Sequence, residues 1–221
     1  MCGFCGFFLK NFEETQLTSN LNLLNEMSVS IKHRGPDGHG QWYNQDKGIF
    51  LDHRRLSILD LSNNATQPMT SNNGRWKIIF NGEIYNYLEL KIKISKENNL
   101  SADFWKSTGD TEVLVNLIDL YGIDETLNLI EGMFSFVVWD NLENQIILAR
   151  DRLGEKPLYY LQDKNNLVFS SDIIAIKKFC KKKLTLDINS VRELIKYNYI
   201  PSPNSIYEKV KKLEAGTYTK I

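Results

Sequence analysis

Cys2 is the first residue of the sequence whose side chain could do chemistry. If the initiator methionine is removed, this residue carries both a thiol and a free α-amine. A thiolate is a strong nucleophile, and an α-amine with an ordinary pKa near ~8 can act as a base close to neutral pH. One residue could then supply nucleophile and base together. Cys2 alone leaves open the alternative of a buried N-terminal cysteine without a chemical role.

Cys2 and Cys5 form a C-x-x-C pair, which also suggests a redox or metal function. Side chains three apart on a strand point to opposite faces, and a structural zinc site needs four ligands. Cys180 and the histidines at 33, 39 and 53 lack the paired spacing of such a site. We therefore expect no metal site and expect Cys5 and Cys180 to be core residues, while a redox dithiol of Cys2 and Cys5 remains a rival hypothesis.

Three further patterns place polar groups near the ends of strands or helices. Asn81 and Gly82 follow a strand, where an amide side chain and a backbone N–H could converge as an oxyanion hole, although Asn-Gly is also a common hairpin turn. Arg55 could bind a carboxylate with two parallel hydrogen bonds, or lie on the surface. Asp110 could receive an ammonium group, or cap the helix that begins beside it. None of these patterns is decisive by itself.

The elements that must position these residues form two strand-rich blocks with helices between and after them. Apolar and β-branched runs predict strands near 4–9, 40–43, 49–58, 76–80, 133–140, 145–150, 157–162 and 166–170. Helical spacing predicts helices over 16–31, 87–100, 111–121, 172–180 and 190–198. The strand over 76–80 is expected to stop at Asn81-Gly82. Two sheets covered by helices would fit one domain.

The composition is that of a globular protein without net charge. Among 221 residues, 42% are hydrophobic, and 27 Lys and Arg balance 27 Asp and Glu. A nucleic-acid-binding protein would need a basic surplus, and no apolar run approaches the ~18 residues that span a bilayer. The chain begins with no signal-peptide pattern and has an odd number of cysteines, three. A reducing, cytoplasmic location is the simplest expectation, with neither nucleic acid nor membrane as a partner.

Recognisable motifs extend nearly from end to end of the chain. They are Met1-Cys2-Gly3-Phe4, His33-Arg34-Gly35-Pro36-Asp37, His53-Arg54-Arg55-Leu56-Ser57-Ile58, Gln67-Pro68-Met69, Phe80-Asn81-Gly82-Glu83-Ile84-Tyr85-Asn86, Gly109-Asp110-Thr111-Glu112-Val113, Gly132-Met133-Phe134-Ser135-Phe136, the run from Arg150 to Tyr160, and Lys212-Leu213-Glu214-Ala215-Gly216. Together they resemble the N-terminal glutamine-hydrolysing domain of the asparagine synthetase family. That domain is a class II glutamine amidotransferase of the N-terminal-nucleophile hydrolase superfamily.

The chain departs from the pattern of this family at three residues and in one larger feature. The residues are Cys5, Asp52 and Gly109, and none of them removes a proposed catalytic group. The larger feature is a C-terminal synthetase domain, whose Ser-Gly-Gly-type loop for ATP pyrophosphate does not occur in the sequence. We therefore expect residues 1–221 to be the glutaminase domain of a longer protein.

The resemblance implies an α+β fold, a four-layer αββα sandwich with two mostly antiparallel sheets between helical layers. It also implies that Cys2 attacks the side-chain amide of glutamine, with its α-amine as the base. The Asn81 side chain and the Gly82 N–H would stabilise the oxyanion. The substrate-binding residues that it implies are Arg55 for the α-carboxylate, Asp110 and Glu83 for the α-ammonium, and the backbone of Leu56, Ser57, Ile58 and Leu59 along the pocket.

The resemblance further implies what happens to the ammonia. In such proteins it passes to an ATP-dependent synthetase domain of the same polypeptide, which makes asparagine from aspartate and uses ATP and Mg²⁺. This chain itself would need no cofactor, and the full-length protein could be a homodimer. Two alternatives remain: ammonia could amidate another carboxylate, such as that of a surface sugar, or the domain could bind glutamine as a regulator without hydrolysing it.

Overall fold

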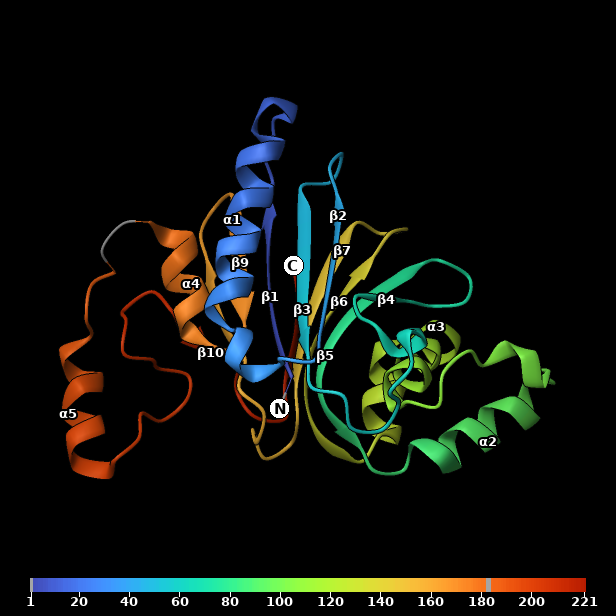
Figure 1. Ribbon diagram of the computed structural model, residues 1–221. Helices are drawn as coiled ribbons and strands as arrows, with labels where there is room; N and C mark the ends of the chain where they lie inside the picture. The colour runs from blue at the N-terminus through green and yellow to red at the C-terminus, as the bar shows by residue number, and fades with distance from the viewer. Residues whose placement is uncertain (1, 182–183) are drawn as a thin grey trace.

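Two antiparallel β-sheets packed face to face form the centre of the protein (Figure 1). The computed structural model describes residues 2–181 and 184–221. The strands of the first sheet, in spatial order, are β10 (Lys211–Lys212), β8 (Tyr159–Gln162), β9 (Asn166–Ser170), β1 (Gly3–Leu9), β3 (Ile49–Arg55) and β2 (Gly38–Asn44). Those of the second are β11 (Tyr218–Lys220), β7 (Gln145–Arg150), β6 (Gly132–Asp140), β5 (Trp76–Ile84) and β4 (Met69–Thr70).

Helices cover the outer face of each sheet. Helices α1 (Leu17–Ser30) and α4 (Ile173–Cys180) lie over the first sheet, and α2 (Tyr87–Glu97) and α3 (Asp110–Leu129) lie over the second (Figure 1). Helix α5 (Ile188–Tyr197) lies beyond the edge of the first sheet that carries β10. The order helix, sheet, sheet, helix confirms the predicted αββα sandwich.

The central strands of each sheet are buried on both faces, and this explains their long apolar runs. Successive side chains of a strand point to opposite faces. In β1, Phe4 packs between the sheets while Phe7 packs under the helices. In β5, Ile79 packs between the sheets while Ile78 packs against the helical layer. A strand buried on both faces has no polar row, so its sequence is apolar at nearly every position.

The predicted elements are largely confirmed, with corrections at their ends. Strand β5 does not stop at Asn81-Gly82 but continues to Ile84, because β6 remains paired with it through Gly132. Helix α3 extends to Leu129, beyond the predicted residue 121, with an interruption at Gly122, whose φ of 78° is a conformation that glycine tolerates. The predicted strand over 49–58 ends at Arg55.

The cysteines outside the pocket lie in or beside the helix-covered core. Cys5 is fully buried, and Cys180 is partly buried against the same cluster. This confirms the prediction that Cys5 is a core residue. Asp172 caps α4, since its carboxylate accepts the N–H of Ile174 at 3.1 Å. Among the described residues, none of the helices combines the length and the apolar character needed to traverse a bilayer.

Candidate active site

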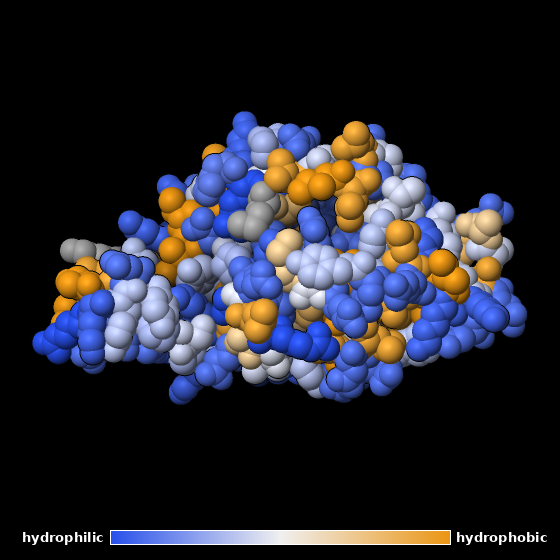
Figure 2. Space-filling view, turned by 90° about the horizontal axis from the view of Figure 1, so that it is seen from below, coloured by the Kyte–Doolittle hydropathy of each residue, from blue (hydrophilic) through white to orange (hydrophobic). Residues whose placement is uncertain are grey.

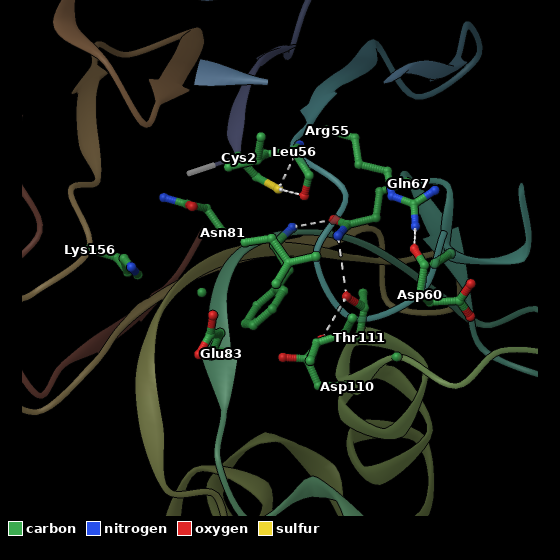
Figure 3. Close-up of a pocket in the computed structure, with 16 residues that line it drawn as sticks. Cys2, Arg55, Leu56, Asp60, Gln67, Asn81, Glu83, Asp110, Thr111 and Lys156 are labelled. Atoms are coloured by element: carbon green, nitrogen blue, oxygen red, sulfur yellow. Dashed lines mark hydrogen bonds between the residues drawn. The ribbon is translucent and has the colours of Figure 1, made fainter. Parts of the chain in front are cut away.

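A pocket lies where β1, β3 and β5 reach the same end of the layer between the sheets (Figure 3). Each strand carries a row of side chains that face this layer, and each row changes from apolar to polar at this end. On β1, the next side chain beyond Phe4 on this face, toward the chain start, is Cys2. On β3, the next side chains beyond Leu51 are His53 and Arg55. On β5, the next side chains beyond Ile79 are Asn81 and Glu83. Period-two spacing therefore brings these side chains together.

The Cys2 thiol is held against the backbone that follows β3. The Leu56 N–H donates to Cys2 Sγ at 3.3 Å, and the Leu56 carbonyl oxygen lies 3.5 Å from the same sulfur. Arg34 Nε donates to the Cys2 carbonyl at 3.2 Å. Burial raises the pKa of the Cys2 thiol above its usual 9.0, although the hydrogen bond from Leu56 acts in the opposite direction. The thiol therefore needs a nearby base to become a nucleophile.

The Asn81 side chain supplies an unused donor beside Cys2. Asn81 is only 1% exposed, and its Nδ2 has no hydrogen-bond partner among the described residues. A buried donor without a partner costs about 1–3 kcal/mol, so its presence in a pocket indicates a group that a ligand satisfies. Asn81 and Cys2 both line the pocket, and in Figure 3 the Asn81 amide is directed away from the Cys2 sulfur.

The Gly82 N–H is a second donor, and the pattern of neighbouring bonds gives its direction. Backbone N–H groups alternate between the two edges of a strand. The Phe80 N–H donates to Gln67 Oε1 at 2.6 Å and the Ile84 N–H donates to Asp110 Oδ2 at 3.0 Å, both away from β6. The Gly82 N–H must point to this same edge, between them. A side chain at Gly82 would also meet the Met133 carbonyl oxygen at 2.2 Å, so the close approach of β6 requires glycine.

Asp110 contributes a buried carboxylate that does not cap its helix. The N-cap of α3 is Gly109, and no side chain makes a capping hydrogen bond there. The Asp110 carboxylate instead accepts the Ile84 N–H, which links α3 to β5. Burial raises the pKa of Asp110 to about 6, since the hydrogen bonds from backbone N–H groups only partly offset it. Near neutral pH the site thus holds an ionised carboxylate without a bound cation among the described residues.

Arg55 and the loop after it form the opposite wall. The guanidinium donates to the carbonyl oxygens of Asp60 and Ser62, the latter at 2.8 Å. Leu56, Ile58 and Leu59 line the pocket as expected. Ser57 is not among the lining residues, and its N–H donates to Asp37 Oδ2 at 2.9 Å.

The pocket lies on a face that is hollowed and has apolar side chains gathered around the hollow (Figure 2). Ile58 and Leu59 are 61% and 49% exposed although they belong to the pocket wall.

Comparison with known proteins agrees with this geometry. The model of the glutamine amidotransferase domain family matches residues 1–221. This chain belongs to the glutamine amidotransferase domain family. Its class as a glutamine amidotransferase domain follows.

Curated relatives of this amidotransferase domain are longer than the chain. "Putative asparagine synthetase (glutamine-hydrolyzing) 2" of Methanocaldococcus jannaschii is 40% identical over 211 residues, which cover 87% of this chain and 39% of the relative. Asparagine synthetase (glutamine-hydrolyzing) 1 of Bacillus subtilis is 33% identical over 221 residues, covering 100% of this chain and 33% of the relative. The chain thus spans between a third and two-fifths of the length of these two proteins.

Two solved structures share the fold of the amidotransferase domain. Glutamine phosphoribosylpyrophosphate amidotransferase from B. subtilis, complexed with ADP and GMP, has a TM-score of 0.62 at 21% identity, over 80% of this chain and 43% of that one. A structure titled as the allosteric regulatory enzyme of purine biosynthesis has a TM-score of 0.69 at 20% identity, over 100% of this chain and 47% of that one. At such identities the likeness concerns the fold alone.

The sequence alone assigned no role to three residues of the amidotransferase pocket, although two of them, Gln67 and Lys156, lie within its motifs. Asp60 accepts the N–H groups of Ser62 and Thr108 at 2.7 and 2.8 Å. The Ser62 hydroxyl, and then these N–H groups, lower the pKa of Asp60 to about 2. The Asp-x-Ser spacing, typical of a turn closed by an aspartate side chain, is the signal for it. Gln67 and Lys156 also line the pocket. Lys156 lies in the loop after Asp151, whose carboxylate is 1% exposed. This carboxylate accepts backbone N–H groups of the loop, the Lys156 N–H among them, and so fixes the conformation of the loop.

Two observations bear on metal and redox hypotheses. In the part of the chain that the structure describes, no three His, Cys, Asp or Glu side chains are grouped so that they could hold a metal ion. Cys2 lines the pocket while Cys5 is buried under the helices, as opposite faces of a strand require.

Proposed function

We propose that this domain hydrolyses glutamine to glutamate and ammonia with Cys2 as the nucleophile. The observation that carries the proposal is the unpartnered Asn81 Nδ2, buried in the same pocket as the Cys2 sulfur. A donor that is left over in the resting site is available to an oxygen that becomes charged during the reaction. The family assignment and the opposite charges of Arg55 and Asp110 in the pocket support it.

The reaction proceeds through a thioester. The Cys2 thiol gives its proton to the α-amine of the same residue, and Sγ attacks the side-chain carbonyl carbon of glutamine. The Asn81 Nδ2–H and the Gly82 N–H then donate to the oxyanion. The α-ammonium returns a proton to the departing nitrogen, the C–N bond breaks and ammonia leaves. Water attacks the thioester carbonyl, the C–S bond breaks, glutamate is released and the free thiol is regenerated.

Recognition of glutamine rests on its two charged α-substituents. Arg55 binds the α-carboxylate, because a guanidinium can donate two parallel hydrogen bonds to it. Asp110 and Glu83 receive the α-ammonium, and the backbone of Leu56–Leu59 lines the side of the substrate. An amide that lacks either charge would lose one of these pairings, and an amide without the ammonium would leave the buried Asp110 carboxylate without a cation, which explains selectivity for an amino acid.

The fate of the ammonia depends on a larger protein. We propose that a synthetase domain of the same polypeptide uses the ammonia with ATP and Mg²⁺ to make asparagine from aspartate, in the cytoplasm and within a homodimer. Support comes from relatives that carry asparagine synthetase in their names and extend well beyond the matched region. This chain supplies no step that uses ATP or a metal. Another carboxylate as acceptor, or a regulatory domain that only binds glutamine, remain the alternatives.

Replacement of the nucleophile tests the proposal. Cys2→Ala should abolish glutamate and ammonia formation while glutamine binding persists, because Arg55 and Asp110 remain. Cys180→Ala serves as the control, since Cys180 lies outside the pocket and should leave the rate unchanged. A diazo-ketone analogue of glutamine should label Cys2 and spare Cys5. Residual hydrolysis by Cys2→Ala, or an adduct on Cys5, would contradict the mechanism.

The base can be tested separately. Met1 lies outside the described residues, and we propose that the active form begins at Cys2. While Met1 is attached, the Cys2 nitrogen is an amide and cannot accept the thiol proton. Equal rates for the processed and the Met1-retaining protein would exclude the α-amine as the base.

A further inference from the structure

The side chain of Gln67 lies along the part of the β5 edge that β4 is too short to pair with. Strand β4 pairs with β5 only through Met69 and Thr70, opposite Ile78 and Lys77. The next N–H along this edge belongs to Phe80, and Gln67 Oε1 accepts it at 2.6 Å. Gln67 is 6% exposed and lines the pocket. Its amide thus replaces the backbone carbonyl that a longer β4 would have provided.

The other end of the same amide reaches the first turn of α3. Gln67 Nε2 donates to Thr111 Oγ1 at 3.2 Å, and Thr111 Oγ1 lies 3.5 Å from Asp110 Oδ1. Asp110 Oδ2 in turn accepts the Ile84 N–H. A closed path therefore runs from β5 through Gln67 and α3 back to β5 (Figure 3).

The Gly82 N–H lies in the middle of this path, between the Phe80 and Ile84 N–H groups that the two side chains bind. We propose that Gln67 is a positioning residue for glutamine hydrolysis, which holds the Gly82 donor and the Asp110 carboxylate at a fixed separation. The inference rests on the proposed function of the pocket. Gln67 touches neither the reacting carbonyl nor the sulfur in this role, and acts through Phe80 and Thr111.

An amide is the side chain that can make both hydrogen bonds of Gln67, which we call its two arms: one to the Phe80 N–H and one to the Thr111 hydroxyl. The Phe80 N–H requires an acceptor, and an amide nitrogen is a donor for the Thr111 hydroxyl at every pH. A hydrocarbon of similar length would leave the buried Phe80 N–H without a partner. Glutamate would retain an acceptor for Phe80 in either protonation state. Substitutions at Gln67 and Thr111 can therefore remove the two hydrogen bonds of Gln67 together or one at a time.

The two arms predict different kinetic effects. Gln67→Met removes both, so kcat should fall about 10–100-fold, the range expected when catalytic groups are displaced by up to about 1 Å, and KM should rise. Gln67→Glu should recover most of kcat, because the bond from Phe80 is kept. Thr111→Val loses only the arm to α3 and should chiefly raise the KM for glutamine. Steady-state kinetics of glutamate release measure all three.

Asn116→Leu is the matched control for a purely structural role. Asn116 is a buried amide of helix α3, away from the pocket. Its side chain accepts the Asn72 N–H at 3.0 Å and donates to the Glu112 carbonyl at 2.9 Å. The substitution should lower the melting temperature without lowering kcat. The rate at which iodoacetamide alkylates Cys2 should be the same in every variant. If Gln67→Met does not fold, Gln67→Asn, one methylene shorter, takes its place with the same expected fall in kcat.

The outcomes distinguish the inference from the function on which it rests. A kcat of Gln67→Met within twofold of the wild type, or a fall matched by Asn116→Leu, would overturn the positioning role while leaving glutamine hydrolysis intact. Absence of glutaminase activity in the processed wild-type chain would instead overturn the proposed function. A fall in kcat that Gln67→Glu reverses and Asn116→Leu does not reproduce supports the inference.

Discussion

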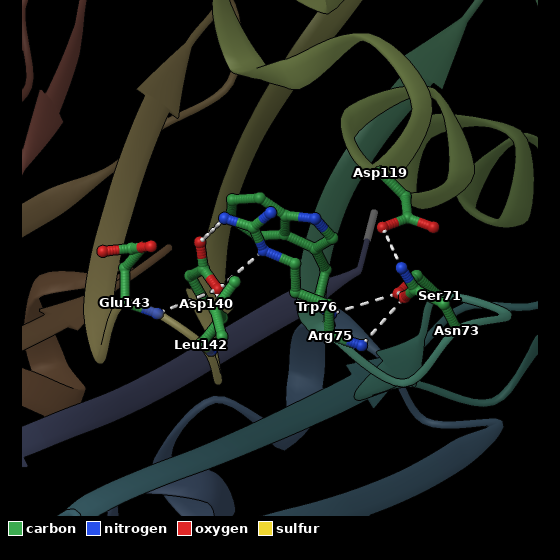
Figure 4. A network of polar contacts seen from close by, with 8 residues as sticks. All are labelled: Ser71, Asn73, Arg75, Trp76, Asp119, Asp140, Leu142 and Glu143. Atoms are coloured by element: carbon green, nitrogen blue, oxygen red, sulfur yellow. Dashed lines mark hydrogen bonds and ion pairs between the residues drawn. The ribbon is translucent and has the colours of Figure 1, made fainter.

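Buried polar groups lie at the two ends of strand β5, on the neighbouring elements β6 and α3 as well as on the strand itself, and they are used in opposite ways. At the beginning of the strand, Asp140 is 2% exposed and accepts two hydrogen bonds from Arg75, at 2.9 and 2.6 Å (Figure 4). The N–H groups of Leu142 and Glu143 donate to the same carboxylate. Burial alone would raise the pKa of Asp140, but the bonds from Arg75 and the backbone outweigh it and lower the pKa.

At the other end of the strand, the charges and donors are not matched in this way. Asp110 is 6% exposed and accepts hydrogen bonds from backbone N–H groups and, at 3.5 Å, from the Thr111 hydroxyl, but it pairs with no cation among the described residues. Burial therefore prevails, and the pKa of Asp110 rises to about 6. Asn81 Nδ2 lacks a partner among the described residues. A polar group that is fully paired stabilises the fold, whereas one left unpaired at a cost in stability indicates a ligand. The same strand therefore has a structural end and a chemical end.

The largest expected effect is on the chemical end. Asn81→Ala should lower kcat about 10²–10³-fold, or about 3–4 kcal/mol, because the lost donor acts where charge develops in the transition state. The melting temperature should hardly change, since the amide nitrogen has no partner to lose among the described residues. Steady-state kinetics and thermal unfolding of the same preparation measure both. A change confined to KM would assign Asn81 to binding of the ground state instead.

The structural end should show the reverse pattern. Arg75→Met leaves the Asp140 carboxylate without its cation, so we expect a loss of about 1–3 kcal/mol in the free energy of unfolding and an unchanged kcat. That loss corresponds to about 2–4 °C in Tm for each kcal/mol in a chain of this size. Because Arg75 is partly exposed, the lower part of the range is the more reasonable expectation. If kcat fell together with Tm, the separation between the two ends would be wrong.

The sequence predicted the layers of the fold because both sheets are buried on two faces. A continuous apolar run such as that of β6 is typical of a strand with no solvent-facing side. The end of β5 was predicted wrongly, since Asn-Gly is a common turn signal and only the pairing with β6 keeps Asn81 and Gly82 extended. Tertiary pairing thus overrode the local preference.

The site was predictable in its residue types but not in its supports. Cys2, Asn81 and Asp110 stood out because their chemistry fits a known family pattern, and the structure places them in one pocket. Gln67 stands in the motif Gln67-Pro68-Met69, but the motif assigned it no role, because that role depends on where β4 ends and where α3 begins. Contacts between segments far apart in the chain, such as Gln67 with Thr111, are set by topology and not by spacing.

The smallest expected effect is a pH dependence of glutamine binding that comes from Asp110. With a pKa of about 6, this carboxyl is mostly ionised at pH 7.5 and mostly protonated at pH 5. The protonated form cannot pair with the α-ammonium, so the Kd for glutamine should rise as the pH falls, by about tenfold between pH 7.5 and pH 5. Calorimetry on Cys2→Ala measures this without interference from the reaction or from the thiol.

Variants at the carboxylates identify the group that titrates. Asp110→Asn should bind glutamine weakly at both pH values and remove the dependence. Asp60, with a pKa near 2, stays ionised over the whole range and cannot produce it. Glu83 lines the same pocket, so a pH dependence that survives in Asp110→Asn but disappears in Glu83→Gln would transfer the ammonium contact to Glu83. A Kd that does not vary with pH in Cys2→Ala would mean that Asp110 does not contact the ammonium, and the unmatched charge at this end of β5 would need another ligand.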